Sequence, residues 1–196
     1  MTTRRKNDLY PTETAVTRQL LSRFGDSIRG NVLEPCAGPG VMALALNLWQ
    51  QRQIITNDID PAHFCDFTSD ATDPTADCWR GQYYNWVITN PPFSVADQIL
   101  PIAFDHADHV AFLLRLTFME PTNGRGDWLD AHKDQMVYQG VLNPRPKFRS
   151  GEINPLTGKL YGTDSVTVAW FVWKKKHSWA ALGVQPPFDF VMGWQS

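Results

Sequence analysis

The spacing of apolar residues changes repeatedly along this chain, and this alternation restricts the fold more than any other feature. Short continuous apolar runs, typical of buried strands, alternate with segments whose apolar residues recur every three to four positions, as in helices. This alternation predicts a mostly parallel sheet with helices on both faces. Helices are expected at 11–24, 40–51 and 94–104, and strands at 31–35, 53–58, 84–90, 109–118 and 164–176.

Two polar residues are expected to begin helices. Thr12 precedes Glu13 and a helical pattern, where a threonine hydroxyl can cap the first free N–H groups. Ser94 stands at the start of the helix expected at 94–104. The order of elements otherwise shows no repeat, and a chain of 196 residues is expected to form one domain, 1–196.

One segment departs from the alternation. Residues 120–164 are rich in proline and glycine, which favours loops, with one helix expected at 126–134 and one strand at 135–142. A long ordered loop within a compact domain is usually functional. We therefore expect this segment to form a lid over a binding site.

Composition constrains the cellular location expected for the protein. No run approaches the roughly 18 apolar residues of a membrane span, and no secretion signal is seen at the N-terminus, so no membrane partner is expected. Cys36, Cys65 and Cys78 are odd in number, which favours a reducing compartment. The expected location is the cytoplasm, of a bacterium or of a phage-infected cell. A net charge of −2 would require a nucleic-acid enzyme to gather its cations on one face.

The stretch "VLEPCAGPG" joins the strand at 31–35 to a helix and contains a candidate ligand site. Gly38 and Gly40 would let a ligand approach the backbone closely. The pattern lacks the third glycine of a dinucleotide site and the Gly-Lys-Ser/Thr ending of a P-loop. Because Glu34 precedes the glycines, a cationic ligand fits better than a pyrophosphate. A simple tight turn is the alternative.

The stretch "NPPF", residues 90–93, ends another strand and contains a candidate catalytic group. The Asn90 side-chain oxygen and the Pro91 carbonyl are two acceptors that could hold the hydrogens of an amine. Pro92 biases Pro91 towards an extended conformation. Phe93 offers a ring on which a flat base could stack. The alternative is a turn that only ends the strand.

Together these stretches resemble the motifs of class I S-adenosylmethionine-dependent amino-methyltransferases. "YPTETAVTRQLL", "LLRLTFMEP" and "NPRPKF…GTDSVTVAWFVW" further resemble small phage and prophage DNA N6-adenine methyltransferases. The resemblance implies a Rossmann-like α/β fold, mostly parallel, with a C-terminal antiparallel strand. Glu13 stands where those enzymes have a second proline. A chain of this length leaves no room for their separate target-recognition domain.

The resemblance also implies roles for particular residues. In this family an acid like Asp58 accepts hydrogen bonds from the cofactor's ribose, and Asp58 matches better than Asp60. The catalytic residues would be Asn90, Pro91, Pro92 and Phe93. The residues that would contact S-adenosyl-L-methionine are Tyr10, Pro11, Thr12, Glu34, Pro35, Cys36, Ala37, Gly38, Gly40, Asp58, Ile59, Asp70, Ala71 and Asn90.

Basic residues are candidates for substrate binding. Arg115 lies in an apolar strand, so it is expected to pair with an acid or to face the site. Arg145, Lys147 and Arg149 alternate along the chain, as in a ribbon that faces phosphates, although a solvated hairpin would show the same pattern. His106 and His109 lack a third ligand, so no metal site is expected.

The predicted activity is transfer of a methyl group to an exocyclic amine, adenine N6 in DNA being favoured. The alternatives are an amine in RNA, a glutamine amide in a protein, or an inactive partner subunit of a methyltransferase. The recognition sequence, the strandedness of the substrate and the choice between monomer and homodimer stay open.

Overall fold

The architecture is taken from a computed structural model. It describes residues 12–50, 54–120, 122, 124–148, 153, 157–160 and 166–187. Among these residues, no helix combines the length and the apolar character that crossing a membrane requires.

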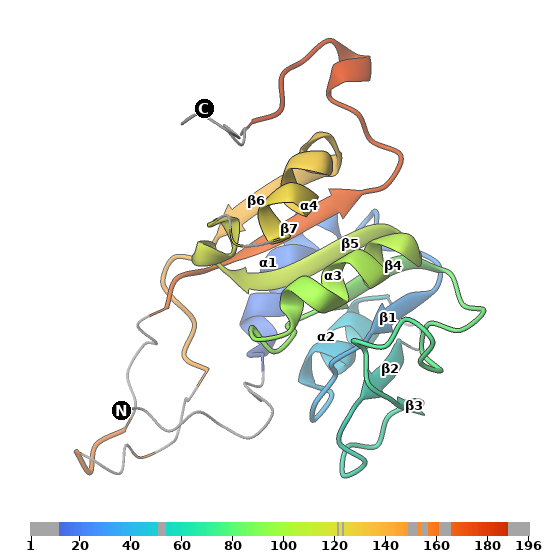
Figure 1. Cartoon of the computed structure of the whole chain (residues 1–196). Coiled ribbons are helices and arrows are strands. Elements are labelled where there is room, and N and C mark those ends of the chain that lie inside the picture. The colour runs from blue at the N-terminus through green and yellow to red at the C-terminus, as the bar shows by residue number, and fades with distance from the viewer. Residues whose placement is uncertain are drawn as a thin grey trace.

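A seven-stranded sheet forms the centre of the protein (Figure 1). Six strands run parallel to one another, and β7 alone is antiparallel to its neighbours. The predicted mostly parallel sheet with a C-terminal antiparallel strand is therefore confirmed. In spatial order the strands are β3 (Phe67–Thr68), β2 (Ile55–Asp58), β1 (Val32–Glu34), β4 (Tyr84–Thr89), β5 (Ala107–Arg115), β7 (Val168–Lys174) and β6 (Met136–Val141).

Helices cover both faces of this sheet (Figure 1). On one face α1 (Thr14–Phe24) and α2 (Val41–Gln50) share a buried cluster with alternate residues of β4, β5 and β7. On the other face α3 (Ala96–Asp105) and α4 (Arg125–Ala131) share a second cluster with the intervening residues of the same strands. Three short 3-10 helices complete the described elements: η2 (Leu116–Met119), η3 (Lys133–Gln135) and η4 (Ala180–Leu182).

The sequence of β5 and β7 explains why neither strand lies at an edge of the sheet. From Val110 to Leu114 and from Val168 to Trp173 every side chain is buried, because each face of these strands packs against helices. Strands covered on both faces have continuous apolar runs in place of alternation. The indole of Trp170 meets its polar requirement by donating to the Val16 carbonyl oxygen at 3.1 Å.

Several expected boundaries are wrong. Glu13, not Thr12, is the N-cap residue of α1, and it makes no side-chain capping bond. Helix α3 begins at Ala96 after Val95, so Ser94 does not open it. The strand expected at 109–118 ends at Arg115, where the chain turns into η2. The two-residue strand β3 was not predicted.

The proline- and glycine-rich segment contains the two expected elements, α4 and β6, within its described residues. Residues 143–148 follow β6 without regular structure.

Candidate cofactor and substrate site

The two motifs lie side by side at the carboxyl ends of two neighbouring strands. Strands β1 and β4 are parallel neighbours, with Leu33 opposite Val87. Glu34 ends β1, and Asn90 directly follows β4. Carboxyl ends of parallel strands form the crevice in which α/β proteins bind ligands. Residues separated by 56 positions in sequence are therefore brought to the same crevice.

Glu34 is buried without full compensation. Only 2% of its surface is exposed, and its Oε2 has no hydrogen-bond partner among the described residues. Burial raises the pKa of this carboxyl, and the negative charge of Asp58 acts in the same direction, against a hydrogen bond from the Ala43 backbone. A cation placed beside Glu34 would stabilise its ionised form.

The loop after Glu34 requires its glycines. Gly38 and Gly40 have φ angles of 51° and 75°, which disfavour residues with a Cβ atom. A Cβ built on Gly40 meets no atom within 4 Å, so the constraint there is conformational and space lies beside the backbone. Pro35 and Ala37, which belong to this loop, are buried. Burial also raises the pKa of the Cys36 thiol. A thiol with a raised pKa stays protonated and is a poor nucleophile.

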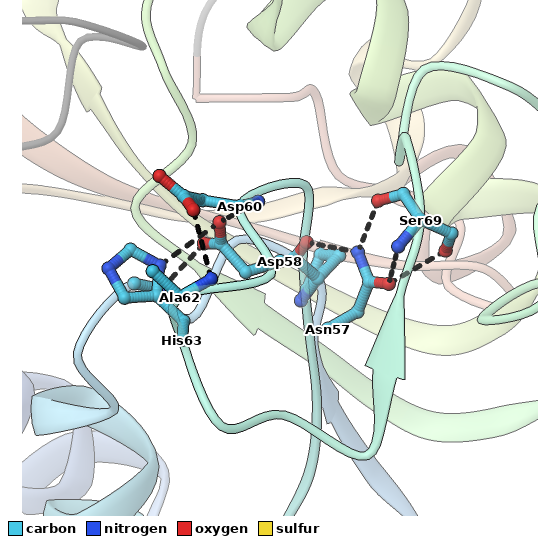
Figure 2. A network of polar contacts seen from close by, with 8 residues as sticks. Asn57, Asp58, Asp60, Ala62, His63 and Ser69 are labelled. Carbon is cyan, nitrogen blue, oxygen red and sulfur yellow. Dashed lines mark hydrogen bonds and ion pairs between the residues drawn. The ribbon is translucent and has the colours of Figure 1, made fainter.

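Asp58 is fixed by backbone groups on both sides (Figure 2). Its Oδ2 accepts a hydrogen bond from the Gly38 N–H at 2.7 Å, and its Oδ1 accepts one from the Asp60 N–H at 2.9 Å. The Nδ1 of His63 lies 3.2 Å from Oδ1. Asp60 instead accepts from the Ala62 N–H as a turn residue. The structure thus distinguishes the buried Asp58, linked to the glycine loop, from Asp60.

Asn57 belongs to the candidate site, and the sequence analysis missed it. Its amide nitrogen donates to the carbonyl oxygens of Pro35 at 2.9 Å and Ser69 at 3.0 Å. Its Oδ1 accepts from the Ser69 N–H at 3.1 Å and from the Ser69 hydroxyl at 2.7 Å (Figure 2). One fully buried side chain therefore joins the loops that follow β1 and β3. A polar residue one position before the end of a strand gives no sequence signal of such a role.

The remaining cofactor candidates on this side lie in the loops after β2 and β3. Ile59 is 54% exposed, directly after Asp58. The Oδ1 of Asp70 accepts from both the N–H and the hydroxyl of Thr72, at 2.9 and 2.8 Å. Ala71 is buried, and its carbonyl oxygen accepts from the Trp79 indole at 3.1 Å. Asp70 and Ala71 thus lie in a hydrogen-bonded turn after β3, whereas Ile59 is an exposed apolar residue after β2.

The turn after β4 meets the segment that precedes α1. The Asn90 amide nitrogen donates to the Thr12 hydroxyl at 3.0 Å, across 78 positions of sequence. Thr12 lies one position before the N-cap residue Glu13, and its hydroxyl contacts this turn. The contact orients the Asn90 amide, since the nitrogen faces Thr12 and the oxygen lies at the other end. Pro91 is buried, and the Pro92 carbonyl accepts from the Val95 N–H at 3.1 Å.

Arg115 lies over the Phe93 ring. Its Cζ is 4.6 Å from the ring centroid, a cation–π geometry. No carboxylate of a described residue forms an ion pair with it. Of the two expectations for Arg115, pairing with an acid is not seen among these residues, whereas a position against the Asn90–Phe93 turn is.

The basic segment after β6 is attached to the start of α1. The Lys147 N–H donates to Oε1 of Glu13 at 3.0 Å, a contact across 134 positions. Pro146 and Phe148 are buried, whereas Arg145 and Lys147 are exposed. The two basic side chains thus share one side of this segment. Tyr10, Pro11 and Arg149 lie outside the described residues.

Comparison with known proteins identifies the fold. No protein-family model and no curated protein sequence matches the chain. Similar solved structures include a proposed RNA methyltransferase from Pyrococcus horikoshii, with a TM-score of 0.54, 18% identity and coverage of 83% of this chain and 82% of that one. A proposed O-methyltransferase from Klebsiella pneumoniae has a TM-score of 0.56 and 8% identity, covering 83% and 81%.

A third similar structure is the methyltransferase subunit of a type I restriction-modification system from Streptococcus thermophilus. Its TM-score is 0.57 at 12% identity, and the match covers 86% of this chain but 44% of that subunit. The chain therefore spans less than half of this relative. These similarities show that the chain has the Rossmann-like methyltransferase fold, as expected from its motifs.

Proposed function

We propose that this protein is an S-adenosylmethionine-dependent methyltransferase acting on an exocyclic amine, with adenine N6 in DNA as the favoured target. The observation that carries the proposal is the shared crevice, where the acids Glu34 and Asp58 lie beside the Asn90–Phe93 turn. A cationic cofactor and an amine substrate need these two arrangements next to each other.

The residues at the ends of β1 and β2 fit such a cofactor. Glu34 has a buried oxygen that no described residue hydrogen-bonds, which suits an ammonium group. The positive φ angles of Gly38 and Gly40 keep the loop free of side chains. The carboxylate of Asp58 would accept from ribose hydroxyls, and the exposed Ile59 would pack against a flat ring. When bound, the cofactor supplies an electrophilic methyl group on a sulfonium.

The turn after β4 would hold the amine. The Asn90 oxygen and the Pro91 carbonyl accept hydrogen bonds from its two hydrogens, which returns electron density to a nitrogen otherwise delocalised into the ring. The bond from Asn90 to Thr12 fixes the amide orientation before the substrate arrives. Acceleration would come from proximity and from preorganised acceptors near the developing charge, with no strong base required.

DNA is favoured as the substrate for two reasons. The restriction-modification subunit supplies a precedent on the same fold, and Arg145 and Lys147 share one exposed side near the site. The Pyrococcus protein keeps RNA as the second candidate. A glutamine amide leaves the basic segment unexplained, and an inactive partner subunit leaves both intact motifs unexplained.

The test is methyl transfer from tritiated cofactor to duplex DNA, single-stranded DNA, total RNA and cell protein, each assayed separately. We expect label in DNA, and mass spectrometry of the digested nucleosides should identify N6-methyladenine. Label only in protein or RNA would contradict the DNA assignment. A wild-type protein that binds no S-adenosylhomocysteine in calorimetry would contradict the whole proposal.

Asn90→Ala separates chemistry from cofactor binding. Losing one preorganised acceptor should lower kcat about 100- to 1000-fold, the usual cost of removing such a group. Binding of S-adenosylhomocysteine should change much less. Asn85→Ala, at the amino end of the same strand, is the matched control and should keep its kcat. Loss of cofactor binding together with activity would mean that Asn90 has a structural role.

A further inference from the structure

Arg115 is the last residue of β5, and its charge is not neutralised by a described acid. Its side chain follows Ala111 and Leu113 in the two-residue alternation, so it lies on the face that α1 covers. Its Nε is buried and has no hydrogen-bond partner among the described residues. Arginine has five N–H donors and normally uses them when it is withdrawn from water. Among the described residues, the Phe93 ring is the group against which the guanidinium lies.

The Phe93 ring is also the surface on which the target base is expected to stack. Phe93 packs against the cluster shared by α1 and the sheet, and the Arg115 guanidinium lies over one face of its ring. Stacked carbon atoms lie about 3.5–4.0 Å apart. A guanidinium carbon 4.6 Å from the ring centroid occupies that layer. The base and Arg115 cannot both cover the ring face over which the guanidinium lies.

We propose that Arg115 holds the place of the target base in the free protein, and that it moves to a phosphate of the bound strand when the base stacks on Phe93. This inference rests on the proposed function and deepens it, because it makes a phosphate-bearing nucleotide the ligand that opens the site. A planar fork of donors matches phosphate oxygens, and such contacts position the strand without reading sequence.

The exchange replaces one cation–π contact with a base stack and charge-assisted hydrogen bonds. It also gives the unpartnered Nε an acceptor. A glutamine side chain offers neither a ring for Phe93 nor a phosphate for Arg115. The arrangement therefore selects nucleotides over peptide amides before the methyl group is transferred.

Nuclear magnetic resonance of the protein labelled with ¹⁵N-arginine can observe the exchange directly. The Arg115 Hε signal is assigned by its absence in Arg115→Lys, and its ring-current shift by the change in Phe93→Leu. Adding a short single-stranded oligonucleotide with one adenine, together with S-adenosylhomocysteine, should remove the shift. The same strand with an abasic site in place of the adenine should leave more of the ring-current shift of Arg115. A shift that persists with the adenine strand bound would overturn the proposal.

Oligonucleotide binding supplies a second measurement. Arg115→Met should weaken binding about tenfold and reduce the slope of log K against log salt by about 0.7, as expected for one lost phosphate contact on a single strand. Arg115→Lys should retain the slope but lose affinity, because it keeps the charge without the fork. A slope unchanged in Arg115→Met would overturn the proposal.

Arg23→Met is the matched control. Arg23 also lies over an aromatic ring, 5.8 Å from the Tyr138 centroid, but in the last turn of α1, at the opposite end of the helix from Thr12. It should change neither affinity nor slope. If the protein methylates DNA and Arg115→Met behaves like Arg23→Met, this inference fails alone. If cofactor binds but no nucleic acid is methylated, the proposed substrate fails instead.

Discussion

Hydrogen bonds on the two sides of the crevice span very different lengths of chain. On the cofactor side, which comprises the loops after β1, β2 and β3, the side chains of Asn57 and Asp58 bond to groups 2 to 22 positions away. On the target side, which comprises Thr12, the Asn90–Phe93 turn, Arg115 and residues 143–148, the bonds join residues 78 and 134 positions apart.

The contrast indicates how the two sides are held together. The cofactor side is a dense local network of buried or half-buried groups, several of which have more than one partner. The target side is assembled from the start of α1, the end of β4 and the segment after β6, which long-range contacts join. We infer that the proposed cofactor site depends on local contacts, whereas the proposed target site depends on how distant segments pack.

The largest effect is expected from Asn57→Ala, which would break the cofactor side. Four hydrogen bonds are lost from a fully buried side chain, and the Pro35 and Ser69 groups are left without them. The free energy of unfolding should fall by about 3 kcal/mol or more, measured by urea denaturation. Asn85→Ala, which removes an exposed amide, is the control and should cost about 1 kcal/mol or less. Equal losses would show that the network does not hold this side together.

A smaller effect, of opposite sign, is expected from Glu34→Gln. Burial raises the pKa of Glu34, so the folded protein loses stability relative to the unfolded chain as the pH rises above the ordinary glutamate value of about 4.3. The uncharged variant avoids this loss. It should gain about 1–3 kcal/mol in unfolding free energy at pH 8 and much less at pH 5.

The same variant should bind S-adenosylhomocysteine more weakly, because the ammonium group loses its counter-charge. Glu120→Gln, at an exposed glutamate, is the control and should change neither property. A stability difference that is the same at pH 5 and pH 8 would contradict the burial argument. Together the two measurements would show that Glu34 lowers the stability of the free protein and raises its affinity for the cofactor.

The smallest effect is expected on the target side, from Glu13→Ala. The variant removes the acceptor of the Lys147 N–H, an exposed contact, and should lower the unfolding free energy by about 1 kcal/mol or less. Hydrogen exchange at the Lys147 amide should become faster, with little change at Gly38. Glu13→Gln keeps an acceptor and should preserve the protection. A loss as large as that of Asn57→Ala would remove the contrast between the two sides.

The sequence predicted the parts of this fold that depend on periodicity. The strands and helices around the two motifs follow from apolar spacing. Their order brings Glu34 and Asn90 to the carboxyl ends of neighbouring strands. What it could not predict depends on contacts between distant residues. Thr12 matches a capping pattern, but its hydroxyl accepts from Asn90. Arg115 was expected to meet an acid or the site, and no periodicity specifies that it would lie over Phe93.

The position of β7 has a consequence for biosynthesis. This last strand lies between β5 and β6, and seven of its residues pair with β5. Until Val168–Lys174 have been translated, β5 and β6 lack their common neighbour and expose unpaired backbone groups, the kind of edge that promotes aggregation. The nascent chain can therefore join β5 to β6 only after Val168–Lys174 has been synthesised and has left the ribosome.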